Sequence, residues 1–228
     1  MTNAVAIIPA RGGSKRIPGK NIRDFAGRPA IAWPLATAAE SNLFAQVVVS
    51  TDSDQIARVA RDHGAETPFT RDAKLSDDHA GTTEVIRDAC QRLGLPDDTP
   101  VCCIYPTALF ITPADLTAGL DKLRRGARWV LTASEYTTPI DRAYRLDGET
   151  LVPRQPDMMP KRSQDLQPAY FDAGQFYWAT AATWRDETAR IWDGAMPVIL
   201  PADRAVDIDT EADWQQAERL YALMQNET

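Results

Sequence analysis

The chain has 228 residues, of which 44% are hydrophobic and 25% are charged, and its formal net charge is −7. This size and composition predict one α/β domain with room for a small insertion, and the acidic balance argues against nucleic acid as a partner. Three cysteines without metal-type spacing predict neither a disulfide framework nor a zinc site. No apolar stretch has the length of a membrane span or the pattern of a secretory signal, so we expect no membrane partner and a cytoplasmic location.

The first part of the chain alternates between short apolar runs and amphipathic segments. This alternation predicts a mostly parallel sheet with helices on both faces. The expected strands span residues 5–10, 46–50, 65–69, 101–105 and 129–134. The expected helices span residues 30–40, the stretch from the 51–54 cap to Gly64, residues 82–93 and residues 113–125.

The pattern changes between residues 136 and 170, where the helical period is lost and prolines become frequent. The Asp147-Gly148 pair predicts a tight turn between short strands at 143–146 and 150–153. We interpret residues 136–170 as an excursion inserted into a single domain of residues 1–228. The chain then returns with expected strands at 174–179, 197–201 and 206–209 and a final amphipathic helix at 211–224.

The most distinctive stretch follows the first expected strand and reads Ala6-Ile7-Ile8-Pro9-Ala10-Arg11-Gly12-Gly13-Ser14-Lys15-Arg16-Ile17-Pro18-Gly19-Lys20-Asn21. No acid precedes Asp24 in this acidic chain, whereas five cations do: Arg11, Lys15, Arg16, Lys20 and Arg23. Glycine lets backbone N–H groups approach phosphate oxygens and cations neutralise their charge, so the loop predicts a phosphate cradle. An ordinary solvated basic loop is the alternative. The spacing matches neither the Walker loop nor the Gly-x-Gly-x-x-Gly pattern.

Two carboxylates, Asp207 and Asp209, stand at the end of the expected 206–209 strand. Residues two apart project to the same face of an extended segment, with Ile208 turned into the core. Paired carboxylates beside a triphosphate suit Mg²⁺, although Asp209-Thr210 also fits a helix N-cap. Because ligands of open α/β sheets bind beyond the carboxyl ends of the strands, we expect this pair, the glycine-rich loop and Tyr105 to converge.

The glycine-rich stretch closely resembles the signature of the CMP-sugar-acid synthetases, the cytidylyltransferases that activate nonulosonic acids. The match covers residues 8–15, Ile17-Pro18 and Lys20-Asn21. The resemblance implies a Rossmann-like three-layer nucleotidyltransferase fold, CTP as substrate and Mg²⁺ as cofactor. It implies that the 2-hydroxyl of a sugar acid attacks the α-phosphorus of CTP and pyrophosphate leaves, a reaction that depends on positioning and charge neutralisation.

The resemblance also assigns roles to residues of the loop and of the carboxylate pair. The matching nucleotide-binding positions are Arg11, Gly12, Gly13, Ser14, Lys15, Lys20 and Asn21. Arg11 and Asn21 are implied to contact the nucleoside, and the two lysines the phosphates. Lys20, Asp207 and Asp209 are the implied catalytic residues, and the two aspartates bind the metal. The residues do not identify the base that takes the hydroxyl proton; the aspartate pair with a metal-bound hydroxide is one possibility.

Two further positions match nucleotide contacts of the family, Arg71 and Thr82. Arg71 follows the expected 65–69 strand and would be a second contact for the anion. A surface salt bridge from Arg71 to Asp72 or Asp77 is the alternative, and Thr82 equally fits a plain helix N-cap.

A second set of motifs bears on the sugar acid. Sialic acid enzymes typically carry Gln-Pro-Thr where this chain has Tyr105-Pro106-Thr107. That tripeptide and the stretches 139–142, 162–170 and 172–178 resemble the pseudaminic acid cytidylyltransferase branch. The resemblance implies acceptor contacts from four residues, Tyr105, Arg142, Arg162 and Tyr177. It also implies a homodimer in which the 136–170 excursion reaches a second subunit.

Other interpretations stay open at this stage. The acceptor could be another acid, namely sialic, legionaminic or 3-deoxy-octulosonic acid. Arg142 could pair with Asp141 or Asp147 on a polar surface instead of meeting a substrate, and Trp178 is expected to face the core. A non-catalytic nucleotide-binding protein on the same fold is the alternative from a different class.

Overall fold

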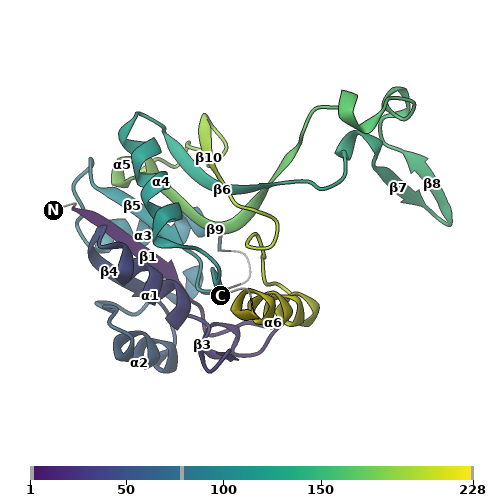
Figure 1. Cartoon of the computed structure of the whole chain (residues 1–228). Coiled ribbons are helices and arrows are strands. Elements are labelled where there is room, and N and C mark those ends of the chain that lie inside the picture. Colours follow the sequence, from purple (N-terminus) through teal and green to yellow (C-terminus); the bar gives the residue numbers. More distant parts are fainter. Residues whose placement is uncertain (1–2, 78–79, 227–228) are drawn as a thin grey trace.

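The computed structural model describes residues 3–77 and 80–226 (Figure 1). Its centre is a six-stranded sheet with the order β10-β6-β9-β5-β1-β4. In chain order these strands are β1 (Ala4–Pro9), β4 (Phe44–Ser50), β5 (Pro100–Ile104), β6 (Trp129–Glu135), β9 (Tyr170–Thr180) and β10 (Ala195–Ile199). β9 runs antiparallel to β5 and β6, and the remaining neighbours pair in parallel. The predicted mostly parallel sheet is confirmed.

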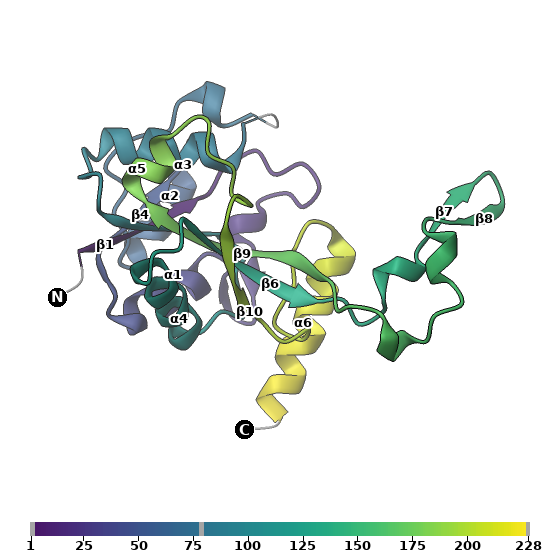
Figure 2. The same ribbon diagram turned by 90° about the horizontal axis from the view of Figure 1, so that it is seen from above.

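Helices cover both faces of the sheet, which makes three layers (Figure 2). One face carries α1 (Ala32–Ser41), α2 (Asp54–Asp62) and α4 (Pro113–Arg124), and the other carries α3 (Thr82–Arg92) and α5 (Ala181–Arg185). Along β1, Ala6 and Ile8 pack into the first layer while Val5 and Ile7 pack into the second. Burial on both faces explains why β1 is a continuous apolar run.

A smaller cluster lies under the last helix, α6 (Glu211–Asn226). Trp214 of α6 meets Phe25 edge to face at 5.7 Å between ring centroids. Ile208 is fully buried in the same cluster, as its place between two aspartates predicted. This burial anchors the segment that carries Asp207 and Asp209.

Two predicted strands are wrong. Residues 65–69 run beside β4 but make isolated bridges, such as Val48 to Glu66, because Pro68 cannot donate to a ladder. Residues 206–209 form no strand, since Val206 and Ile208 are held by packing in the α6 cluster. The short antiparallel pair β2 (Asp24–Phe25) and β3 (Arg28–Pro29) and the helix α5 were not predicted.

The excursion leaves the body after β6 and returns at the start of β9. We call residues 136–169 the arm; it projects away from the sheet in both views (Figures 1 and 2). Its hairpin joins β7 (Tyr144–Asp147) to β8 (Thr150–Pro153), which confirms the predicted turn with a one-residue shift of the first strand. Leu146 and Leu151 face each other across the hairpin and are 70% and 62% exposed.

Among the described residues, no helix combines the length and apolarity that crossing a membrane requires. The three cysteines, Cys90, Cys102 and Cys103, are free and buried. They are therefore core residues of the two layers.

Candidate active site

A cavity of about 390 Å³ opens at the carboxyl ends of β1 and β5. Its walls come from the glycine-rich loop after β1, the segments 71–77 and 80–85, the loop after β5 and the segment 207–209. The predicted site residues that line it are Arg11, Ser14, Lys15, Lys20, Asn21, Arg71, Thr82, Tyr105, Asp207 and Asp209. The expected convergence of separate loops at this edge of the sheet is therefore present in the structure.

The glycine-rich loop is packed tightly against the start of α2. The N–H of Gly12 donates to Oδ1 of Asp52 at 2.9 Å. A Cβ on Gly12 would lie 3.1 Å from the Cβ of Ser53, so a larger residue would push the loop outward. Gly19 takes a φ of 64° just before Lys20, a backbone conformation that glycine adopts without strain. Gly12 and Gly13 shape the loop without lining the cavity.

The cations of the loop meet the carboxylate segment across the cavity. Nζ of Lys20 donates to the carbonyl oxygen of Ile208 at 2.5 Å and lies 3.6 Å from Oδ1 of Asp209. Burial lowers the pKa of Lys20, against the opposing effect of the Asp209 and Asp207 carboxylates. Arg16 pairs with Asp209 at 3.0 Å, a contact that the sequence did not single out. These contacts link the glycine-rich loop to the segment 207–209 and fix the two walls relative to each other.

Arg71 is a buried cation rather than a surface one. Its residue is 5% exposed, and its guanidinium lies 3.8 Å from Asp52. Burial lowers its pKa, and the buried Nε and one terminal nitrogen have no hydrogen-bond partner in the described structure. The alternative of a surface salt bridge to Asp72 or Asp77 is therefore wrong. Buried donors that face a cavity without partners fit an anion.

Asn21 presents an acceptor of the kind that a cytosine edge requires. The residue is 4% exposed, and its Nδ2 donates to the carbonyl oxygen of Arg11 at 3.0 Å. Its Oδ1 is buried without a partner in the described structure and belongs to a residue that lines the cavity. Cytosine carries an amino donor where uracil has a carbonyl acceptor, so this oxygen can distinguish the two bases.

Asp207 and Asp209 both line the cavity. Partial burial raises the pKa of Asp207, and the neighbouring Asp209 carboxylate adds to the effect. The Asp209-Thr210 alternative is confirmed for Thr210, which caps α6 by accepting from the N–H of Asp213 at 3.3 Å. The carboxylate of Asp209 pairs with Arg16 and Lys20 instead. Within residues 3–77 and 80–226, no group of three or more His, Cys, Asp or Glu side chains is arranged to hold a metal. Two hard oxygen donors fit Mg²⁺ when a triphosphate supplies the other ligands.

The two tyrosines that are predicted to contact the acceptor, Tyr105 and Tyr177, lie next to one another. Tyr105 lines the cavity, and its hydroxyl is 2.7 Å from that of Thr82. Thr82 is the first residue of α3 after the N-cap Gly81, so the simple N-cap role is wrong. Tyr177 packs edge to face on Tyr105, with ring centroids 5.7 Å apart. Burial raises the pKa of Tyr105 to about 12 and that of Tyr177 further, so both phenols stay protonated.

A second cavity, of about 620 Å³, adjoins the first and shares Thr82 and Tyr105 with it. Its other walls come from α3 and from the loop after α5. The added lining residues are Thr83, Glu84, Arg87, Glu187, Ala189, Arg190, Ile191 and Trp192. Sequence reasoning missed all of these, because no motif marks either this face of α3 or the loop after α5.

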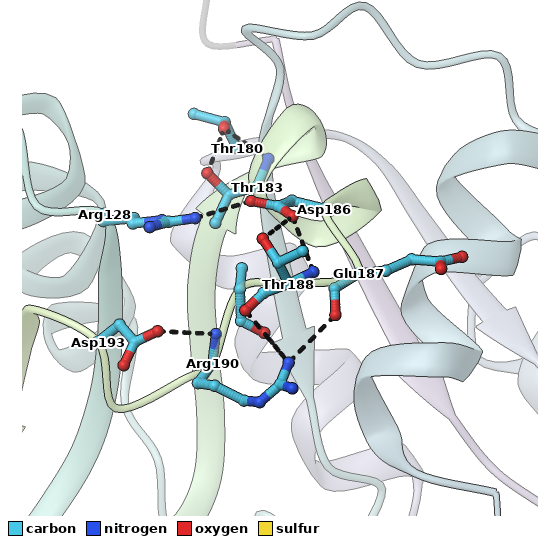
Figure 3. A network of polar contacts seen from close by, with 9 residues as sticks. Arg128, Thr180, Thr183, Asp186, Glu187, Thr188, Arg190 and Asp193 are labelled. Carbon is cyan, nitrogen blue, oxygen red and sulfur yellow. Dashed lines mark hydrogen bonds and ion pairs between the residues drawn. The ribbon is translucent and has the colours of Figure 1, made fainter.

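Polar contacts hold that loop in shape (Figure 3). Asp186 accepts from Thr188 and pairs with Arg128 of the body at 2.8 Å. One guanidinium nitrogen of Arg190 lies 3.1 to 3.3 Å from three carbonyl oxygens, those of Glu187, Thr188 and Ala189. The loop is therefore a preformed wall of the second cavity.

The arm arginines lie elsewhere. Arg142 donates to the carbonyl oxygen of Lys161 and to Ser163 instead of Asp141 or Asp147, and Arg162 pairs with Asp165 at 2.9 Å. Neither lines one of the two cavities of its own chain. Trp178, in contrast, is buried and stacks on Phe44, which confirms the core position expected for it.

Cations and carboxylates on opposite walls of one cavity, at the carboxyl edge of a parallel sheet, are the arrangement of a nucleotidyltransferase, in which positioning and charge neutralisation carry the reaction. The profile of the cytidylyltransferase family matches residues 5–174, and the chain belongs to this family. It is a CTP-dependent nucleotidyltransferase.

Individual relatives agree with this assignment. The chain is 39% identical to a pseudaminic acid cytidylyltransferase of Campylobacter jejuni subsp. jejuni over 96% of each chain. It is 31% identical to a CMP-N,N'-diacetyllegionaminic acid synthase of Legionella pneumophila over 97% of each chain. The solved structure of CMP:2-keto-3-deoxy-manno-octonic acid synthetase complexed with CTP has the same fold, with a TM-score of 0.72 and 18% identity over 98% of this chain and 100% of that one.

Proposed function

We propose that this enzyme transfers CMP from CTP to the 2-hydroxyl group of a nonulosonic acid, with pseudaminic acid as the favoured acceptor. The observation that carries the proposal is the pair of adjoining cavities. One is surrounded by cations and carboxylates, and the other extends from it past Tyr105 and Thr82. The identity over nearly the whole chain to a pseudaminic acid cytidylyltransferase supports the choice of acceptor.

CTP occupies the first cavity in this proposal. Oδ1 of Asn21 accepts from the cytosine amino group, and Lys15, Lys20 and Arg71 neutralise the triphosphate. Asp207 and Asp209 would hold Mg²⁺, which when bound neutralises charge on the phosphate oxygens. The support is the cavity position of all these side chains and the unpartnered polar atoms of Asn21 and Arg71.

The sugar acid occupies the second cavity, with its 2-hydroxyl at the junction beside Tyr105. There the hydroxyl oxygen loses its proton to solvent and bonds to the α-phosphorus, while the bond to the pyrophosphate oxygen breaks and pyrophosphate leaves. Arg87 is the cation suited to the acceptor carboxylate, because its buried Nε has no partner in the described structure. Trp192, which is 73% exposed on the cavity wall, offers a flat apolar surface to the rest of the sugar.

A homodimer completes the proposed assembly. The arm exposes large apolar side chains for which the chain itself provides no cover, among them Leu146 and Leu151. Packing of the arm on a second copy would bury them and bring Arg142 and Arg162 towards the partner. We place the enzyme in the cytoplasm, where its nucleotide substrate is made; three free, buried cysteines agree with a reducing compartment.

The test is pyrophosphate release from CTP and Mg²⁺ with a panel of pseudaminic, legionaminic, sialic and 3-deoxy-octulosonic acids. We expect the highest kcat/KM for pseudaminic acid and a new CMP-sugar in the product mixture. Turnover of sialic acid without turnover of pseudaminic acid would refute the choice of acceptor. CTP binding without pyrophosphate release for any acid would refute the transfer reaction.

A further inference from the structure

β9 contains a large bulge at the carboxyl edge of the sheet. Leu131 of β6 pairs with Tyr177, but Ala133 pairs with Asp172. A step of two positions along β6 is therefore matched by a step of five along β9, so residues 173–176 have no ladder partner on β6, although Phe176 still pairs with Ile104 of β5. Bulges of this kind re-aim side chains next to functional sites.

The bulge is a built feature with satisfied backbone groups. The N–H groups of Gln175 and Phe176 approach the hydroxyl oxygen of the buried Thr132 at 3.1 and 3.4 Å. The N–H of Gly174 donates to Oδ1 of Asp172 at 2.9 Å. Gly174 has a φ of 62°, which favours glycine at this position.

On one side the bulge holds the metal-side carboxylate segment. Gln175 is 1% exposed, and its Nε2 donates to the carbonyl oxygens of Ala173 at 2.7 Å and of Val206 at 3.0 Å. Val206 precedes Asp207 directly. A Cβ on Gly174 would lie 3.3 Å from Cγ of Asp207, so a larger residue at this position would press on this side chain.

On the other side the bulge holds the two tyrosines. Oδ2 of Asp172 accepts from the hydroxyl of Tyr177 at 2.9 Å. The carbonyl oxygen of Gln175 accepts from the backbone N–H of Tyr105 at 2.9 Å. One short segment therefore contacts both walls between which the two substrates must meet.

We propose that the β9 bulge is a positioning device that sets the distance between the metal-side carboxylate and the acceptor-side tyrosines. Gln175 is the positioning residue for Asp207, and Asp172 is the positioning residue for Tyr177. The inference rests on the proposed function, because it assigns Asp207 to Mg²⁺ and Tyr177 to the acceptor side. It goes beyond that function because Gln175 and Asp172 are assigned the role of positioning other side chains.

Gln175→Met tests the metal side, since methionine keeps the length of the side chain and removes the donor to Val206. The full chain with CTP is titrated with Mn²⁺ as a probe and followed by electron paramagnetic resonance. We expect Mn²⁺ to bind about tenfold more weakly, the size of effect known for residues that orient metal ligands. Affinity for CTP in EDTA should stay within twofold. Gln91→Met, on the exposed face of α3, is the matched control.

Asp172→Asn tests the acceptor side; Asp172 is exposed, and asparagine keeps the size of its side chain. We expect Mn²⁺ affinity to be unchanged and the KM for the sugar acid to rise about fivefold, because a neutral acceptor binds the Tyr177 hydroxyl less strongly. Tyr177→Phe should reproduce the rise in KM.

Any of three results would overturn the proposal. Gln175→Met could bind Mn²⁺ as tightly as the parent, or it could lose affinity for Mn²⁺ and for metal-free CTP by the same factor. Asp172→Asn could keep the parent's KM for the sugar acid. If Gln175→Met does not fold, the acceptor KM of Asp172→Asn decides. If the parent turns over no sugar acid, the proposed function fails, while the Mn²⁺ titration still tests the bulge.

Discussion

The glycine-rich loop and the arm both carry cations that suit anionic substrates, but their surroundings differ. Lys20 is hydrogen-bonded to the carbonyl oxygen of Ile208, which is 188 positions away in sequence, and the N–H of Gly12 donates to Asp52, which is 40 positions away. Arg162 of the arm is exposed and pairs with Asp165, three positions away. The loop is thus held by distant parts of the chain, whereas the arm is held by its near neighbours.

This difference bears on how each region acts. Side chains fixed by tertiary contacts are preorganised, and they bind a ligand without a large cost in conformational entropy. An exposed arginine that pairs with a near neighbour gains little from the pair and can exchange it for another partner. We infer that one chain builds the nucleotide site by itself and that the arm works when a second chain meets it.

The largest expected effect lies in the preorganised region. Asp209→Asn removes a proposed metal ligand and the partner of Arg16 and Lys20. Loss of several kcal/mol of transition-state stabilisation corresponds to a fall in kcat of about 10²- to 10³-fold. Pyrophosphate release at saturating CTP and Mg²⁺ measures it. Asp203→Asn, in the exposed loop ahead of the pair, is the control. Unchanged Mg²⁺-dependent activity in Asp209→Asn would mean that this pair does not carry the reaction.

The next effect lies in the arm. Leu146→Asp with Leu151→Asp places two charges on the exposed apolar hairpin. Truncated or charged anchor residues typically cost an interface about 2 kcal/mol each, so each change should weaken the proposed dimer about 30-fold. Analytical ultracentrifugation of parent and variant measures the shift from two chains to one. Leu223→Asp, which is similarly exposed on α6, should leave the mass unchanged. If the arm variant had the same mass in solution as the parent, the arm would not contribute to dimerisation.

The smallest effect concerns base selection within the nucleotide cavity. Asn21→Leu removes Oδ1, the acceptor proposed for the cytosine amino group, in a side chain of similar size. We expect the ratio of kcat/KM for CTP over UTP to fall about tenfold, the value of one hydrogen bond. Ser14→Ala, which changes another lining residue without an amide, should keep the parent ratio. If Asn21→Leu kept the parent's ratio, Asn21 would not be the residue that selects the base.

Sequence reasoning reached the central strands and helices because their signals are local. The apolar run of β1, the Thr112-Pro113 start of α4 and the Asp147-Gly148 turn each depend on neighbouring residues. It failed for residues 65–69 and 206–209. Whether a short apolar run joins a sheet depends on Pro68 in one case and on packing under α6 in the other.

The chemical character of the nucleotide site was also present in the sequence alone, since the loop residues 11–21 are contiguous and the two aspartates stand two positions apart. What the tertiary structure decided is the second cavity, which we propose for the acceptor. Arg87 and Trp192 line the same cavity because α3 and the loop after α5 share a face of the sheet. Gln175 reaches Val206 because β9 bulges where the two segments cross. Such contacts join residues far apart in the chain, and no local pattern of apolar or charged residues encodes which of them will touch.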